Sequence, residues 1–142
     1  MPSHPPLRVV LLGYGLAGRV FHAPLIGAEP GLELIGVVTS DPERQAQARA
    51  DLPGVAILET AEQAWTSGAD VAVVATANSA HVPQATAALT AGMHVVVDKP
   101  LAGSASEAQA LIDLAAAHQA ILLSKDQAVI CMRKRLVTLG AD

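Results

Sequence analysis

Short apolar runs alternate with longer segments of mixed polarity along most of the chain. Each run has four to eight residues and is dominated by valine, leucine, isoleucine and alanine, which predicts β-strands over residues 7–12, 32–39, 55–58, 70–75, 93–97 and 120–123. The segments between them predict helices over 17–28, 42–50, 83–91 and 104–118, and after residue 60. This alternation predicts an α/β fold, a doubly wound parallel sheet of about six strands.

Turn and capping residues mark the ends of several predicted helices. Pro30 and Gly31 stop the first helix, and Gly92 ends the fourth. Thr60–Gln63 and Ser104–Glu107 have the spacing of capping boxes, in which the first and fourth residues satisfy each other's backbone N–H groups. The nearly unbroken apolar run 70–75 is typical of a strand that is buried on both faces of a parallel sheet.

Composition limits the class of protein. With 142 residues, of which 51% are hydrophobic, the chain is long enough for one domain with a sizeable core. Aromatic residues make up only 2%, so alanine, valine, leucine and isoleucine must build that core. The net charge is −4 and there is no basic stripe, which argues against nucleic acid as a partner.

Cysteine usage and the first residues bear on the compartment. Cys131 is the one cysteine, so no intrachain disulfide and no zinc cluster are expected, and we predict no metal site. Residues 1–6 are polar and rich in proline, without an apolar signal core, and no apolar run reaches the length of a membrane span. We therefore expect a cytoplasmic protein that does not engage a membrane.

A glycine-rich motif, Gly13-Tyr14-Gly15-Leu16-Ala17-Gly18, follows the first predicted strand and opens the first predicted helix. In that context G-x-G-x-x-G is the signature of a dinucleotide site. Gly13 would permit the tight turn, Gly15 would let the backbone approach the pyrophosphate, and Gly18 would let the helix pack closely on the sheet. The phosphates would lie at the positive end of the helix.

The end of the second strand bears on the choice of cofactor. An acidic residue there accepts a hydrogen bond from the ribose 2′-hydroxyl of NAD, whereas a small or basic residue tolerates the phosphate of NADP. Asp41 at the tip would favour NAD; Ser40 at the tip, helped by Arg44, would allow NADP. Asp41 could instead serve as the N-cap before Pro42, so the prediction stays NAD or NADP.

Two further segments follow predicted strands at the same edge of the sheet. Asn78 and His81 come after the fourth strand, where they could line the cofactor crevice, although Asn78 could equally cap the next helix. Lys99 follows the fifth strand. A lysine desolvated in a crevice can act as a general acid or base or donate to a substrate hydroxyl, and the alternative is a solvated lysine paired with Asp98.

Taken together, these segments resemble the N-terminal part of the glucose–fructose oxidoreductase / inositol dehydrogenase / MocA family. The resemblance covers about residues 7–124 and rests on the glycine motif, on Phe21-His22-Ala23-Pro24, on residues 76–81, and on the run 94–100 that ends in Asp98-Lys99-Pro100. The family usually has Glu-Lys-Pro at the last position. The order and spacing of these motifs are far more specific than any one of them.

The resemblance implies an NAD(P)-dependent oxidoreductase that moves a hydride to or from a carbon bearing a hydroxyl or carbonyl group, typically on a sugar, polyol or related small molecule. Lys99 would match the lysine beside nicotinamide and substrate that helps the proton leave or arrive. The residues expected to contact the cofactor are Gly13, Tyr14, Gly15, Leu16, Ala17, Gly18, Thr39, Ser40, Thr76, Asn78 and His81.

The chain departs from the family in length and in its last residues. Family members are about twice as long or more, and their second α/β domain supplies much of the substrate pocket and the oligomer surface. After Ser124 the sequence departs from the family pattern. Residues 1–124 carry five basic and eleven acidic side chains, whereas residues 125–142 carry four basic and two acidic ones. We therefore expect an NAD(P)-binding Rossmann domain over 1–124, an atypical tail over 125–142 and no substrate domain, as in a truncated or frame-altered product.

The first hypothesis is therefore the dinucleotide-binding domain of an oxidoreductase, which would be catalytically incomplete by itself. Two alternatives remain open. The chain could be a non-catalytic dinucleotide sensor or interaction module, or a truncated remnant without function. Surface that a second domain would normally cover should promote self-association, so a homo-oligomer is expected.

Overall fold

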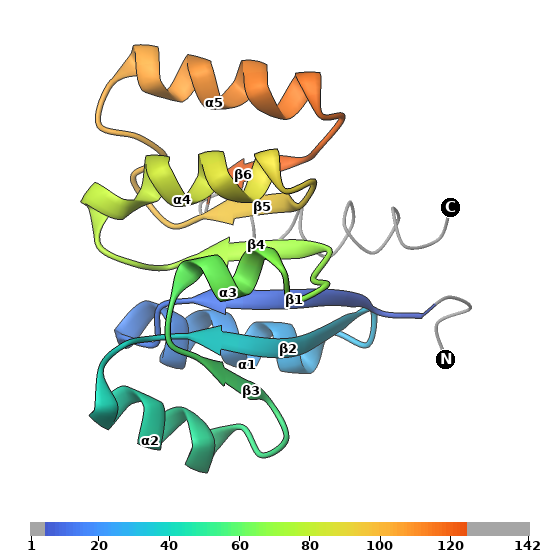
Figure 1. Cartoon of the computed structure of the whole chain (residues 1–142), viewed down its shortest axis with the longest axis vertical. Coiled ribbons are helices and arrows are strands. Elements are labelled where there is room, and N and C mark those ends of the chain that lie inside the picture. Colours follow the sequence, from blue (N-terminus) through green and yellow to red (C-terminus); the bar gives the residue numbers. More distant parts are fainter. Residues whose placement is uncertain (1–4, 125–142) are drawn as a thin grey trace.

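The computed structural model describes residues 5–124, so the predicted tail, 125–142, lies outside the described residues. Strands and helices alternate along this part of the chain (Figure 1). In chain order they are β1 Leu7–Leu12, the π-helix η1 Ala17–His22, α1 Ala23–Ala28, β2 Leu32–Val38, α2 Pro42–Asp51, β3 Ala56–Leu58, α3 Ala61–Trp65, β4 Val71–Val74, α4 Asn78–Thr90, β5 His94–Val97, α5 Ala105–Ala117 and β6 Leu122–Ser124.

The six strands form one sheet in the order β3-β2-β1-β4-β5-β6, and every neighbouring pair is parallel. The order reverses at β1, so the chain winds outward first on one side and then on the other. This is the doubly wound topology that the sequence predicts, and the crevice of such a sheet lies where the order reverses, outside the carboxyl ends of the strands. Those ends point to the left in Figure 1.

Alternate residues of the strands build two cores on the two faces of the sheet. On β1, Val9 and Leu11 face the core that contains residues of α1 and α2, whereas Val10 and Leu12 face the core that contains residues of α3, α4 and α5. Figure 1 accordingly shows α1 behind the sheet and α3 and α4 in front of it. Both faces of β4 are fully buried, as the apolar run predicts.

The structure begins α4 at Asn78, five residues before the predicted start at residue 83. The prediction was wrong because Pro83 was taken for the start of the helix, whereas the proline lies inside α4. Pro83 has no N–H to donate to the carbonyl of Ser79, and a proline ring crowds that carbonyl, so the helix is weakened at this turn but continues through it. Consequently the N-terminus of α4 lies directly at the carboxyl end of β4.

Several predicted helix ends are confirmed by hydrogen bonds. Ser104 Oγ accepts from the N–H of Glu107 at 3.2 Å, and Gln63 Oε1 accepts from the N–H of Thr60 at 3.1 Å. Gly92, with φ of +88°, follows the end of α4 in a conformation that L side chains rarely adopt. The first helix differs in kind from the prediction, because its opening turn has π geometry: the N–H of Ala23 reaches the carbonyl of Gly18.

Candidate functional site

The loops that leave β1, β2 and β4 meet at the carboxyl edge of the sheet and enclose a pocket. Backbone hydrogen bonds hold the strand ends together there, including Gly13 N–H to the Val38 carbonyl at 2.9 Å and Ala75 N–H to the Leu12 carbonyl at 2.8 Å. The pocket has a volume of about 350 Å³. Its lining residues are Gly13, Gly15, Val38, Thr39, Ser40, Arg44, Glu59, Ala61, Ala75, Thr76, Ala77 and Gln84.

The three glycines of the motif differ in what surrounds them. Gly13 has φ of +99°, and a Cβ there would collide with the carbonyl of Ala75; a Cβ on Gly18 would collide with the carbonyl of Gly13. Around Gly15 the nearest protein atom to such a Cβ is Arg44 Cζ, at an ordinary contact distance of 3.6 Å. Gly13 and Gly18 are therefore required by the fold, whereas at Gly15 only the flexible end of the Arg44 side chain lies within contact distance, and Gly15 presents bare backbone to the pocket.

The turn after β2 is fixed by a cluster of short hydrogen bonds. Asp41 Oδ1 accepts from the N–H groups of Glu43 and Arg44 at 2.8 and 3.3 Å, so this carboxylate is the N-cap of α2. Gln45 Nε2 donates to the carbonyl of Thr39 at 2.8 Å, which ties α2 back to the strand end. Of the open alternatives for Asp41, the N-cap is the one that the structure contains, and Ser40 is left exposed at the pocket.

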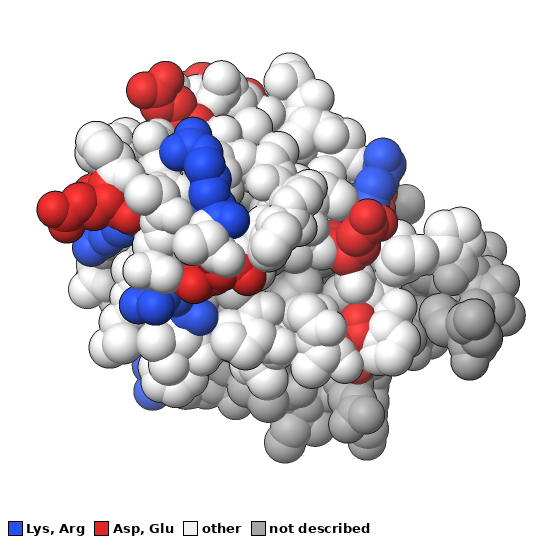
Figure 2. All heavy atoms as spheres, turned by 90° about the horizontal axis from the view of Figure 1, so that it is seen from below, with Lys and Arg blue, Asp and Glu red and all other residues white. Residues whose placement is uncertain are grey.

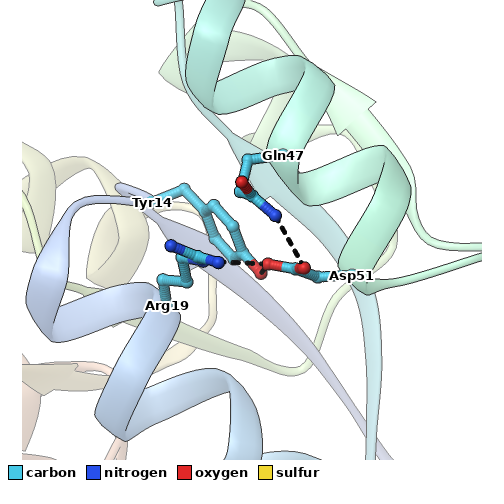
Figure 3. Close-up of polar contacts among 4 residues, drawn as sticks. All are labelled: Tyr14, Arg19, Gln47 and Asp51. Carbon is cyan, nitrogen blue, oxygen red and sulfur yellow. Dashed lines mark hydrogen bonds and ion pairs between the residues drawn. The ribbon is translucent and has the colours of Figure 1, made fainter.

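Tyr14 does not line the pocket, and its side chain reaches Asp51 and anchors the glycine loop to α2 (Figure 3). Its buried hydroxyl donates to Asp51 Oδ2 at 2.8 Å, and the same carboxylate accepts from Arg19 Nε at 3.0 Å and from Gln47 Nε2 at 2.8 Å. Burial, followed by the hydrogen bond to Asp51 and its charge, raises the pKa of Tyr14 to about 12. The hydrogen bond from Tyr14 is the largest cause that lowers the pKa of Asp51.

His81 joins the two loops that follow β4 and β5. Its side chain is 1% exposed, with Nε2 at 2.9 Å from the carbonyl of Thr76 and Nδ1 at 2.7 Å from the carbonyl of Pro100. Thr76 is held from a second side, because its hydroxyl donates to Gln84 Oε1 at 2.6 Å. Both ring nitrogens of His81 therefore face backbone carbonyls, and the ring spans the crevice wall between Thr76 and the residue after Lys99.

Lys99 follows β5 and is exposed, next to a pair of titratable residues that are largely buried. The preceding residue, Asp98, has its Oδ1 at 3.2 Å from Nε2 of His22, whose side chain is 3% exposed. The N–H of Asp98 donates to the carbonyl of Val74 at 2.8 Å, which fixes the start of this loop against β4. His22 thus connects η1 to the backbone that carries Lys99.

The structure brings together only some of the residues that the sequence singled out. Five of them line the pocket: Gly13, Gly15, Thr39, Ser40 and Thr76. The other seven lie outside its lining. Tyr14 and Gly18 make internal contacts, Leu16 is exposed, and Ala17 and Asn78 begin η1 and α4. His81 lies in the crevice wall, and Lys99 follows β5. Their contacts with a cofactor stay predictions.

Sequence reasoning missed two features of this edge. In the sequence His22 stands out only as part of the run Phe21-His22-Ala23-Pro24, yet in the structure it pairs with Asp98; its position four residues after Gly18 could have suggested an inward-facing side chain, because residues four apart share a helix face. Glu59 and Gln84 also line the pocket. No local motif marks them, because β3 and α4 bring them to the site only in the folded chain.

Three further properties of the described residues bear on possible partners: the surface charge, the placement of possible metal ligands, and the length of the apolar helices. On the face that carries α2 and β3, basic and acidic side chains lie beside one another, with no continuous basic area (Figure 2). Within residues 5–124, no group of three or more histidine, cysteine, aspartate or glutamate side chains is placed to hold a metal ion. No helix in the same range is long and apolar enough to cross a membrane.

Comparison with known proteins identifies the domain. Residues 7–125 match the sequence model of an oxidoreductase family, Gfo/Idh/MocA, described as having an NAD-binding Rossmann fold. The chain is 43% identical over 110 residues to YdgJ, an uncharacterized oxidoreductase of Escherichia coli, in a match covering 77% of this chain and 31% of that protein. It is 32% identical over 119 residues to the scyllo-inositol 2-dehydrogenase (NADP(+)) IolW of Bacillus subtilis, covering 83% of this chain and 32% of that protein.

A solved structure also resembles this chain over the same domain. A Klebsiella pneumoniae protein, described as a putative oxidoreductase, superposes with a TM-score of 0.80 at 41% sequence identity, over 86% of this chain and 35% of that chain. The chain therefore spans about a third of the length of the relatives it matches.

Proposed function

This chain belongs to the Gfo/Idh/MocA oxidoreductase family and forms its NAD-binding Rossmann domain, and on that premise we propose that it holds NAD or NADP for a sugar or polyol dehydrogenase. Bound nicotinamide would supply the hydride acceptor or donor. The substrate would be a small molecule with a hydroxyl-bearing or carbonyl carbon. The Bacillus subtilis relative, a scyllo-inositol dehydrogenase by name, supports a polyol or sugar as the substrate class.

The observation that carries this proposal is the bare backbone of Gly15 in the lining of a pocket at the carboxyl edge of the sheet. Gly13 and Gly18 fix the glycine loop, so Gly15 presents backbone without a side chain to that pocket. The helical segment after the loop begins at Ala17, and its first backbone N–H groups have no partner within a helix. A pyrophosphate would be held there by backbone donors and by the helix dipole.

Lys99 is the candidate catalytic residue for the proton. Its ammonium group would donate to the reacting oxygen when a carbonyl is reduced, and the neutral amine would withdraw that proton when an alcohol is oxidised. His22 and His81 support it from two sides, since His22 pairs with the adjacent Asp98 and His81 contacts the carbonyl of the following Pro100. These contacts would hold the lysine in one place, which hydride and proton transfer both require.

The remaining part of the enzyme would complete the substrate site. The chain covers about a third of its relatives, so a substrate pocket and the partners of Lys99 in catalysis would come from a further domain. We therefore expect dinucleotide binding by this chain and no appreciable turnover without that domain. A cytoplasmic location and a homo-oligomer stay predictions.

The test is titration of the purified chain with NADH and with NADPH, followed by calorimetry and nicotinamide fluorescence. Binding in the micromolar range is expected, and Gly15→Trp should abolish it because the indole would enter the pocket that Gly15 lines. Gly27→Trp is the matched control, since Gly27 lies on α1, outside the pocket lining, and a Cβ added there would have no atom within 4 Å. Binding of neither dinucleotide would refute the proposed function.

Lys99 is tested separately. Lys99→Met should leave the affinity of the chain for the dinucleotide within about threefold, because a catalytic contact to the substrate oxygen contributes little to cofactor binding. In a hybrid that joins residues 7–124 to the rest of YdgJ, the same change should lower kcat by about two orders of magnitude or more. Robust dehydrogenase turnover by the chain alone would contradict the need for a further domain.

A further inference from the structure

We propose that this site selects NADP over NAD, and that Arg44 and Ser40 bind the phosphate on the adenosine 2′-oxygen. The inference rests on the proposed function, because it concerns which dinucleotide the same pocket accepts. Three observations at the end of β2 carry it: the position of Ser40, the use of Asp41 as a helix cap, and the placement of the Arg44 guanidinium.

The first two observations concern the strand end itself. β2 ends at Val38, so Thr39 and Ser40 are the residues that border the pocket, and Ser40 is exposed with no hydrogen bond from its side chain to any residue in 5–124. Asp41 lies one residue further on and does not line the pocket. In the usual NAD site an acidic side chain at the strand tip accepts from the 2′-hydroxyl, and this turn places a serine there.

Asp41 is not free to move into that position without cost. Its Oδ1 accepts from two backbone N–H groups of α2, and the turn is further held by Gln45 on the carbonyl of Thr39. Removing an N-cap of this kind destabilises a helix by about 1 kcal/mol. The carboxylate that the sequence offered as an NAD determinant is therefore committed to the helix.

The third observation is the guanidinium of Arg44. Arg44 lines the pocket, and its Cζ and Nη2 lie 3.6 Å from the Cβ position of Gly15, so the group lies over the glycine loop, on the same side as Ser40. Within residues 5–124 this guanidinium makes no hydrogen bond or ion pair. A guanidinium presents several N–H donors in a plane and binds phosphate oxygens in pairs, which suits a phosphate monoester.

Acidic groups near the pocket limit how strongly the site can prefer NADP over NAD. Glu59 lines the same pocket, and Asp41 and Glu43 flank the turn, so the phosphate would approach one cation among three carboxylates. The helix cap already pairs Asp41 with backbone donors, and the positive end of α2 adds to the attraction. Arg44 should therefore carry most of the preference, and Glu59 should weaken it.

The first experiment compares NADPH and NADH binding to the full chain by calorimetry at low and moderate salt. We expect NADPH to bind at least about tenfold more tightly, the equivalent of one charge-assisted contact. The affinity for NADPH should also fall more steeply with salt, because ions screen an exposed contact between charges. Equal affinities, or tighter binding of NADH, would overturn the inference while leaving dinucleotide binding intact.

Variants then identify the residue responsible. Arg44→Gln should lower the affinity for NADPH about tenfold and change that for NADH less than about threefold. Arg49→Gln is the matched control, because Arg49 is exposed in the last turn of the same helix and lies outside the pocket lining. Ser40→Asp should reverse the preference by repelling the phosphate and accepting from the 2′-hydroxyl.

The outcomes separate the two proposals. If Arg44→Gln weakens NADPH and NADH equally, the guanidinium binds the pyrophosphate that both share, and the selection by Arg44 is refuted. If neither dinucleotide binds the wild-type chain, the proposed function fails and the inference fails with it. A loss confined to NADPH in Arg44→Gln, with Arg49→Gln unchanged, supports both.

Discussion

The hydroxyl of Tyr14 shows how one side chain in the glycine motif serves the fold of the site. Tyr14 lies between the first two glycines of the motif, yet its hydroxyl points to Asp51 at the end of α2. The same helix carries Asp41 and Arg44 at its other end. Tyr14 therefore sets the distance between the glycine loop and the turn that would border the adenosine ribose.

Stability at alkaline pH should depend on Tyr14. Its folded pKa of about 12 lies above the ordinary value of 10.0, so the fold favours the neutral phenol; this contribution is complete below pH 10 and is lost as the pH rises through 12. Tyr14→Phe should cost about 1 kcal/mol at pH 7, as expected for one buried hydrogen bond. Urea unfolding at several pH values should show a smaller loss of stability between pH 10 and 12 in the variant. Parallel curves for both proteins would refute this role.

At the scale of elements, α2 would connect the fold to the proposed choice of cofactor. Its N-cap fixes where Ser40 and Arg44 lie, and its last residue binds the glycine loop. The early start of α4 has a similar effect, since it brings the first turn of that helix, and with it His81, to the carboxyl end of β4. Most residues that line the pocket lie in the loops between strand ends and helix starts, so the helix starts set the course of these loops.

Variants of Asp41 distinguish its role as a helix cap from a role in binding NAD. Asp41→Ala should lower the free energy of unfolding by about 1 kcal/mol, whereas Asp41→Asn, which caps nearly as well, should change it by only a few tenths. If the carboxylate serves only the helix, Asp41→Asn leaves the affinity for NADH unchanged. A selective loss of NADH affinity in Asp41→Asn, measured by calorimetry, would instead make Asp41 a ribose ligand.

At the scale of the whole molecule, one helical segment exposes apolar side chains. Leu16, directly before η1, is 74% exposed, and Val20 and Phe21 on η1 and Leu25 on α1 are 49, 47 and 44% exposed. Such a cluster on a small domain is typical of a surface that another protein surface covers. The chain spans about a third of its relatives, so their remaining domain is one candidate for that cover.

Self-association through this segment is expected of the isolated chain. Leu25→Lys should shift the chain toward monomer in sedimentation equilibrium, because it places a charge within the apolar surface. Ile112→Lys is the matched control, since Ile112 is also 49% exposed but lies on α5. A monodisperse wild-type monomer by light scattering at high concentration would count against the prediction.

The sequence by itself determined the fold class, the six strands and the position of the glycine loop, because hydrophobic periodicity and turn residues are local properties of a chain. It also offered Asp41 both as a cap and as a ribose ligand, and could not decide between them, since both require the same residue type at the same place. The hydrogen bonds of the folded turn decided for the cap.

Only the tertiary structure showed which distant residues meet. His22 and Asp98 are 76 residues apart, and Tyr14 and Asp51 are 37 apart, so no spacing along the chain relates them. Glu59 follows β3 and reaches the pocket because parallel strands align their carboxyl ends, whereas Gln84 is brought there by α4. The pairing of strands, and not any local pattern, places a guanidinium over the glycine loop and two histidines around the loop that carries Lys99.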